Sequence, residues 1–198
     1  MVRFKNRYLL VEFLNPSSLS LLPTTQTTDH KHQPIDDSDS DDEYIPVPLP
    51  GAVFLYPTLP NGGLGLGEDG GQVIYRSTRN QIVEVFGDEG WGRVASSFKV
   101  IYHSPLTSLT ILRIARPHVQ TLHTGITLLS LTPPSNRDVR LVPRVIGLSG
   151  TIRKCQNRAI ANHRWVVACL LGGMGEVERE KVEKVEKRER EAMERVEG

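Results

Sequence analysis

The sequence has few cysteines and no long hydrophobic run, and these two absences exclude several classes of protein. Its cysteines, Cys155 and Cys169, have neither CxxC spacing nor matching histidine pairs, so neither a disulfide framework nor a zinc site is indicated. A reducing, intracellular location fits this cysteine usage best. No stretch approaches the roughly 20 consecutive apolar residues that cross a bilayer, so no membrane partner is expected.

The first residues, MVRFKNRYLLVEFLNP, do not have the form of a secretion signal. Charges precede an apolar run, but the run is short, contains Glu12 and ends without a small-residue cleavage site. Alternation of side chains instead predicts a strand over residues 3–13, with Arg3, Lys5 and Arg7 on one face at its start.

The net charge of +1 conceals strong segregation of charge along the chain. Residues 29–43 carry seven acids and one base, and residues 176–197 carry nine acids and seven bases. The remainder has 16 bases, 13 of them arginine, against 7 acids, a net charge of +9. Guanidinium groups form bidentate hydrogen bonds to phosphate and stack on bases, so this composition favours a nucleic-acid partner over a merely soluble basic surface.

The periodicity of the chain predicts strand, helix, strand, strand, helix, strand. The strands are expected at 3–13, 93–103, 106–115 and 139–148, and the helices at 72–86, stopped by Gly87, and 117–129, opened by Pro117. This order is that of an α+β, ferredoxin-like (split βαβ, RRM-like) antiparallel sheet, here with added C-terminal helices. In that topology the last strand lies at a sheet edge, where Pro143 is tolerated because an edge residue needs no ladder donor.

We expect four parts in the domain organisation. They are the first strand of the domain (1–14), a Pro-, Gly- and acid-rich insertion (15–70), the remainder of the α/β nucleic-acid-binding domain (71–171) and a charged helical tail (172–198). The insertion has too little apolar surface to offset the entropy of ordering, so we expect it to be largely disordered. The tail alternates acids and bases with isolated apolar residues, which is typical of a mostly solvated helix or a frayed end.

The segment SGTIRKCQNR, residues 149–158, is the strongest candidate for a binding site. Ser149 or Thr151 is placed to cap a helix that begins at Ile152. The free N–H groups and the positive dipole end of a helix N-terminus favour anions.

The residues that follow the cap predict phosphate as the anion. Gly150 permits close approach of the backbone, Arg153 and Lys154 lie in the first turn, and Asn157 and Arg158 follow them at i+4. Cations are unfavourable at this end of a helix, so their presence suggests an anion that compensates them. The alternative is that they are ordinary solvated side chains, and charge alone leaves both readings open.

With the basic stripe of the first strand, these residues form the set of expected contacts to nucleic-acid phosphates. The set is Arg3, Lys5, Arg7, Gly150, Thr151, Arg153, Lys154, Asn157 and Arg158. No catalytic residue, metal ligand or protein-bound cofactor is expected.

The segments MVRFKNRYLLVEF and GTIRKCQ closely resemble the Pop-five family, the small α/β protein subunit of eukaryotic ribonuclease P and ribonuclease MRP. The resemblance covers residues 1–13 and 149–170, and the elements between 72 and 148 fit in the same order. Residues 15–70 depart from the family, whose first strand is usually followed more directly by its helix. The tail departs too, because it is of mixed charge where family members often end in an acidic tail.

The resemblance implies a non-catalytic subunit that packs against ribonuclease P RNA and ribonuclease MRP RNA. It implies a TIM-barrel-like partner subunit, other holoenzyme proteins and an indirect contact with precursor tRNA. The expected roles are removal of 5′ leaders from precursor tRNA and processing of pre-ribosomal RNA, in the nucleus and nucleolus. The RNA would supply the active site and its Mg²⁺, so the protein is not expected to be an enzyme on its own.

Two other functions stay open from the residues themselves. A stand-alone nuclease would need clustered carboxylates or a His/Lys pair, which the sequence does not offer. A ferredoxin-like protein-interaction module without RNA binding is the alternative. The expected third strand, LTSLTILRIA, has no aromatic residue and the RNA-recognition strand motif is absent, so base stacking across the sheet is not predicted.

Overall fold

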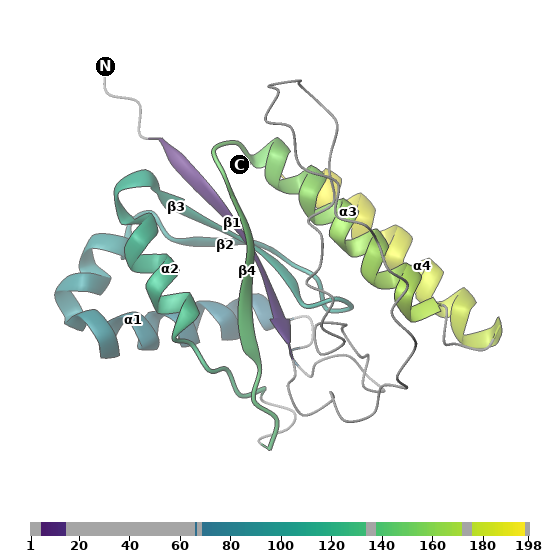
Figure 1. Cartoon of the computed structure of the whole chain (residues 1–198), viewed down its shortest axis with the longest axis horizontal. Helices are drawn as coiled ribbons and strands as arrows, with labels where there is room; N and C mark the ends of the chain where they lie inside the picture. Colours follow the sequence, from purple (N-terminus) through teal and green to yellow (C-terminus); the bar gives the residue numbers. More distant parts are fainter. Residues whose placement is uncertain (1–4, 15–65, 67–68, 134–137, 172–175, 197–198) are drawn as a thin grey trace, which may run out of the picture.

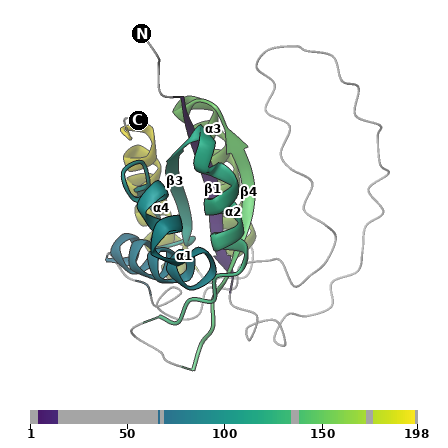
Figure 2. The same ribbon diagram turned by 90° about the vertical axis from the view of Figure 1, so that its left-hand side faces the viewer.

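The computed structural model of the chain describes residues 5–14, 66, 69–133, 138–171 and 176–196. These residues form three layers, a sheet of four strands with two helices on each face (Figures 1 and 2). The strands are β1 (Asn6–Leu14), β2 (Lys99–His103), β3 (Leu109–Ala115) and β4 (Val142–Ser149). The helices are α1 (Gly70–Ala95), the short 3-10 helix η3 (Arg116–His118), α2 (Val119–Thr127), α3 (Ile152–Leu171) and α4 (Glu176–Glu194).

The sheet has the order β2-β3-β1-β4, and every pair of neighbouring strands is antiparallel. This is the α+β, ferredoxin-like arrangement predicted from the element order. β4 lies at an edge, as the presence of Pro143 requires, and Pro143 pairs with Phe13 of β1. The prediction of fold class and of the edge strand is therefore confirmed.

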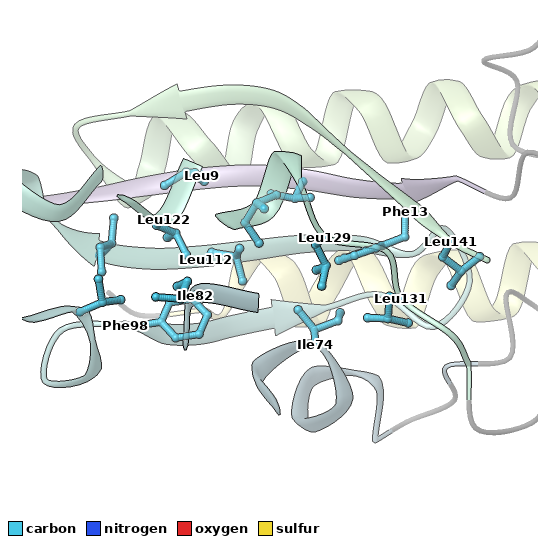
Figure 3. Packing of buried hydrophobic residues seen from close by; sticks show 14 of the residues in the cluster. Leu9, Phe13, Ile74, Ile82, Phe98, Leu112, Leu122, Leu129, Leu131 and Leu141 are labelled. Carbon is cyan, nitrogen blue, oxygen red and sulfur yellow. The ribbon is translucent and has the colours of Figure 1, made fainter. Parts of the chain in front are cut away.

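The first hydrophobic core fills the space between the sheet and helices α1 and α2 (Figure 3). Leu9, Val11 and Phe13 of β1 point into it and meet Ile74 and Ile82 of α1. Side chains in a strand alternate between the two faces of its sheet. The residues of β1 that alternate with these three must therefore point to the opposite face of the sheet.

That opposite face carries a second hydrophobic core, covered by α3 and α4. Tyr8 and Leu10 of β1 pack there with Cys155 and Ala159 of α3 and Met193 of α4. β1 is thus buried on both faces, which is why its sequence is nearly continuously apolar after its basic start.

The first part of α1 is the helix predicted at 72–86, and Gly87 interrupts it there as predicted, although a second helical segment continues to Ala95. Gly87 has a φ of 69°, which lies in the left-handed region, and the chain returns to helix beyond it. Because glycine adopts this conformation without steric cost, the residue kinks the helix and redirects its last turns.

The strand predicted at 93–103 is consequently wrong at its start, and β2 begins only at Lys99. In the last turns of α1, Trp91 packs edge-on against Phe98, with ring centroids 6.2 Å apart, and Val94 is fully buried. The burial of two side chains at helical spacing outweighs the local preference of this segment for strand.

The turn between β2 and β3 is longer than predicted, since β3 begins at Leu109 and not at Leu106. The Ser104 hydroxyl accepts a hydrogen bond from the N–H of Thr107 at 3.1 Å. The Ser104 side chain thus binds the N–H of Thr107, a backbone group that would have paired with the neighbouring strand if the ladder of β2 and β3 were longer. β4 likewise starts later than the strand predicted at 139–148.

Helix α4 lies beside α3 (Figure 1). Most of its described side chains are exposed, as expected, but Met193 and Glu189 are buried. The Glu189 carboxylate accepts hydrogen bonds from the Ser104 hydroxyl and from the N–H of Leu106. The Gln156 amide of α3 donates to the Met193 and Val196 carbonyls at 3.1 and 2.6 Å, so the helix end is docked and not frayed.

The predicted insertion, 15–70, lies outside the described residues apart from Leu66, Asp69 and Gly70. Its expected disorder stays a prediction. Leu66 is buried in the first core next to α1. None of the helices in the described part of the chain is long and apolar enough to cross a membrane.

Gly125 lies inside α2 because α1 passes too close for a side chain there. A Cβ atom at Gly125 would stand 2.8 Å from Cγ1 of Ile82. We predict that Gly125→Ala lowers the free energy of unfolding by about 1–2 kcal/mol, because overpacking outweighs the gain in helix propensity. The matched control is Gly92→Ala in α1, where no atom lies within 4 Å of the new methyl group. Urea denaturation should show the control stabilised by up to about 1 kcal/mol, and equal effects of both changes would contradict this account.

The docked end of α4 should contribute measurably to stability. Met193 is 0 % exposed in the second core, and we expect Met193→Ala to cost about 2–4 kcal/mol through lost burial and the remaining cavity. Glu191→Ala on the same helix removes only an exposed ion pair with Arg195, so its effect should stay within about 0.5 kcal/mol. Thermal unfolding monitored by circular dichroism compares the two variants, and a Met193→Ala protein as stable as the control would mean that α4 is not docked.

Candidate nucleic-acid interface

The starts of β1 and β2 and the ends of β3 and β4 lie at the same end of the sheet, because all neighbouring strands are antiparallel. The pairing of Asn6 with Ala115 and of Tyr8 with Ser149 aligns these ends. α3 begins directly after β4, so its N-terminus lies at this end too (Figure 1). Folding therefore brings together the two basic segments that the sequence singled out.

Two glycines at this end are covered by arginine side chains. A Cβ atom at Gly150 would lie 3.0 Å from Nη1 of Arg7. A Cβ atom at Gly147 of β4 would overlap the guanidinium group of Arg158. Gly150 does permit a close approach, as predicted, but the group that approaches it is a guanidinium of β1.

The segment 149–158 divides into an outward and an inward set of side chains. Thr151, and not Ser149, caps α3, since its hydroxyl accepts a hydrogen bond from the N–H of Lys154 at 3.4 Å. The exposed side chains are those of Thr151, Arg153, Lys154 and Asn157; Arg158 is partly buried, and Cys155 and Gln156 point into the domain. Because an α-helix turns once every 3.6 residues, the candidate contacts of this short motif lie on one face of α3 and its core residues on the other.

The basic stripe of the first strand is described only in part. Lys5 is exposed and Arg7 is half-buried, with its Nη1 donating to the Asn6 carbonyl at 3.3 Å. Arg3 lies outside the described residues, so its predicted contact is not tested.

Three basic residues that sequence reasoning missed join this end of the sheet. Lys99 of β2 pairs with Arg113 of β3, and Arg113 pairs in turn with Tyr8 of β1, so one row crosses three strands. Arg116 follows β3, and its N–H donates to the Lys5 carbonyl at 2.8 Å. Arg113 and Arg116 stand at the end of the strand predicted at 106–115, but Lys99 lies inside the strand predicted at 93–103, and only strand register brings the three together.

We call this set of residues the basic surface. It consists of Lys5, Arg7, Lys99, Arg113, Arg116, Arg153, Lys154 and Arg158. Among the described residues, five of its members are exposed and form no ion pair: Lys5, Lys99, Arg116, Arg153 and Lys154. The Nε atom of Arg113 is buried without a hydrogen-bond partner in the described part of the chain. Cations gathered at one place without internal counter-charges create a positive potential that attracts anions.

The described residues contain no group of three or more His, Cys, Asp or Glu side chains that could hold a metal ion. Burial raises the pKa of the Cys155 thiol to about 12, so it is not a nucleophile at neutral pH. Burial also lowers the pKa of His103 and of His163 to about 4, so both are neutral. The arrangement is suited to binding an anion and not to proton transfer.

The sequence model of the Rpp14/Pop5 family matches residues 7–160 of this chain. The chain belongs to the Rpp14/Pop5 family. The match begins in β1 and ends within α3, so it includes the basic surface from Arg7 to Arg158 and excludes α4. The resemblance to the Pop-five family seen in the sequence is thereby confirmed.

Two relatives carry related names. The chain is 31 % identical over 167 residues to "Ribonuclease P/MRP protein subunit POP5" of Schizosaccharomyces pombe, covering 83 % of this chain and 89 % of that protein. It is 28 % identical over 87 residues to "Probable ribonuclease P/MRP protein subunit POP5" of Dictyostelium discoideum, covering 44 % and 48 % of the two chains. A chain of the cryo-EM structure of yeast ribonuclease MRP is similar at a TM-score of 0.41 and 11 % identity, over 85 % of this chain and 98 % of that one.

The first turn of α3 carries Lys154 at the position where a carboxylate would favour helix stability. Lys154→Glu would create the Thr-x-x-Glu capping box with Thr151 and would complement the helix dipole. We predict that this change raises the free energy of unfolding by about 0.5–1.5 kcal/mol. The control Arg164→Glu makes the same change in charge in the exposed middle of α3 and should leave stability nearly unchanged. Chemical denaturation at low salt measures both, and a destabilised Lys154→Glu protein would contradict the capping geometry.

Proposed function

We propose that this chain is a non-catalytic, RNA-binding protein subunit of ribonuclease P and ribonuclease MRP. The observation that carries the proposal is the basic surface, in which five exposed cations from separate segments meet at one end of the sheet without ion-pair partners among the described residues. Membership of the Rpp14/Pop5 family and the names of the two relatives support the assignment of the chain to these two ribonucleoprotein particles.

The chemistry of the basic surface suits phosphate groups of a folded RNA. Lys5, Arg116 and Lys99 come from the strand ends, and Arg153 and Lys154 stand on the first turn of α3. Helix and strand ends hold these groups at fixed spacing, so the protein neutralises and positions RNA backbone without reading its sequence. The binding free energy should then come largely from counterion release.

The proposed role of the chain in the cell follows from the roles of ribonuclease P and ribonuclease MRP. The RNA supplies the active site and holds its Mg²⁺, and the protein contributes binding and positioning. We propose that the chain supports removal of 5′ leaders from precursor tRNA and processing of pre-ribosomal RNA in the nucleus and nucleolus. Its proposed neighbours are the catalytic RNAs, a TIM-barrel-like protein subunit and other proteins of the holoenzyme.

The proposal is tested by removing two cations from α3. We expect Arg153→Ala with Lys154→Ala to weaken binding to ribonuclease P RNA and to flatten the slope of log K against log salt concentration by about one or two units. Filter binding or fluorescence anisotropy over a series of KCl concentrations measures the slope.

The matched control removes two exposed cations of α4, through Lys184→Ala with Lys187→Ala. This variant has the same net charge but leaves the basic surface intact, so its slope should equal that of the unmodified protein. An unchanged slope in the α3 variant, or equal flattening in both variants, would exclude the proposed phosphate contacts.

A further inference from the structure

A groove of about 820 Å³ follows the outer edge of the sheet, between β2 and the N-terminal half of α1. All five residues of β2, Lys99–His103, line it, and α1 contributes Gln72, Tyr75 and Arg76. Lys99 also belongs to the basic surface. The groove therefore continues from the basic surface along the edge of the domain.

The charge of the groove favours an anionic occupant. Arg76 and Lys99 are both exposed, and neither forms an ion pair within the described part of the chain. Asp69 is the single acid among the residues that line the groove. Two unpaired cations in a concave site attract phosphate more strongly than the same cations on a flat surface.

One wall of the groove is aromatic and rigid. The ring of Tyr75 stacks on that of Phe98, with centroids 5.3 Å apart and planes within 12°. Trp91 meets Tyr75 edge-on at 5.8 Å and is brought there by the kink at Gly87. A side chain held by two other rings loses little conformational freedom when a ligand packs against it.

An extended peptide is a poor match for the same groove. The ladder of β2 is interrupted between Val100 and Tyr102, where the register with β3 shifts. A bulge and a charged residue on an edge strand disfavour the pairing of a further strand, because they twist the edge and break its row of free backbone groups. The chemistry of the groove thus favours phosphates and bases over a β-strand.

We infer that this groove binds a segment of single-stranded RNA, with phosphates beside Arg76 and Lys99 and a base packed against Tyr75. The inference rests on the proposed function, since it extends the basic surface to a second kind of RNA structure. A volume of about 820 Å³ lies within the range of sites that bind small ligands. Unpaired bases are accessible to aromatic side chains, whereas those of a duplex are stacked inside it.

The test uses the full chain with two labelled probes, a ten-nucleotide oligouridylate and a 20-base-pair RNA duplex. We expect Arg76→Ala to lower the affinity for the oligouridylate about fivefold at 0.1 M salt and to flatten its salt slope by about 0.7, the value for one phosphate contact on a single strand. Affinity for the duplex should be unchanged. Arg76→Lys keeps the positive charge and should retain most of the affinity. Fluorescence anisotropy measures all of these values.

The control is Arg164→Ala, which removes the same charge from an exposed residue of α3 that does not line the groove. Its affinity for the oligouridylate should stay within about twofold of the unmodified protein, because long-range charge effects are largely screened at this salt concentration. Equal losses in the two variants, or no binding of the oligouridylate, would overturn the inference. Stronger competition by a ten-residue glutamate peptide than by unlabelled oligouridylate would overturn it in favour of an acidic protein partner.

The two binding experiments distinguish a failure of the groove inference from a failure of the proposed function. If the Arg153→Ala, Lys154→Ala protein shows a flattened slope on ribonuclease P RNA while the oligouridylate does not bind, the groove inference alone fails. If the slope on ribonuclease P RNA is unchanged and Arg76→Ala still weakens oligouridylate binding, the contacts proposed for α3 fail and the groove inference holds. Photocrosslinking of a 4-thiouridine-substituted oligouridylate adds a direct readout, with crosslinks expected in residues 70–76 or 99–103.

Discussion

β1 is hydrogen-bonded to β3 on one side and to β4 on the other, and its register with both decides where the rest of the domain lies. The side chains of β1 enter both hydrophobic cores in alternation. Its one buried acid, Glu12, binds Arg144 of β4 at 2.6 Å and accepts a bond from Asn162 of α3. Burial raises the pKa of the Glu12 carboxyl and the Arg144 guanidinium opposes that shift. These contacts join β1, β4 and α3, and α3 is the helix that presents the candidate RNA contacts.

Because helices cover both faces of the sheet, neither face is open to a ligand (Figure 2). RNA-recognition domains that stack bases on the sheet need one of these faces free. Here α3 and α4 occupy the face that such domains use, and Met193 is buried at its centre. Under the proposed function, the surfaces left for RNA are the end of the sheet and its β2 edge, where the basic surface and Arg76 lie.

The concentration of positive charge at one end of the sheet costs free energy of folding, and the proposed contacts with RNA account for that cost. Arg153 and Lys154 stand near the positive end of the α3 dipole, where cations are unfavourable by some tenths of a kcal/mol each. The Nε atom of Arg113 is buried without a described hydrogen-bond partner, which also costs free energy. Proteins retain such costs mainly at sites that bind something. Under the proposed function, a phosphate backbone would relieve the first of these costs by supplying the missing negative charge.

The sequence by itself determined the local elements and the segregation of charge. Alternation predicted β1, helical spacing predicted the first part of α1, and Ser149 or Thr151 predicted the start of α3, because each depends on neighbours within a few residues. The edge position of β4 followed from the ferredoxin-like order of the elements, with which Pro143 agrees. The tertiary structure decided how distant segments meet. Lys99, Arg113 and Arg116 join Lys5 and Arg153 only through strand register, which no local pattern encodes. The last turns of α1 became helix instead of strand because Val94 is buried in the first core and Trp91 packs against it. The end of α4 docked because Met193 is buried in the second core. The groove beside β2 depends on the first of these events, since it lies between a strand that starts late and a helix whose kink brings Trp91 against Tyr75.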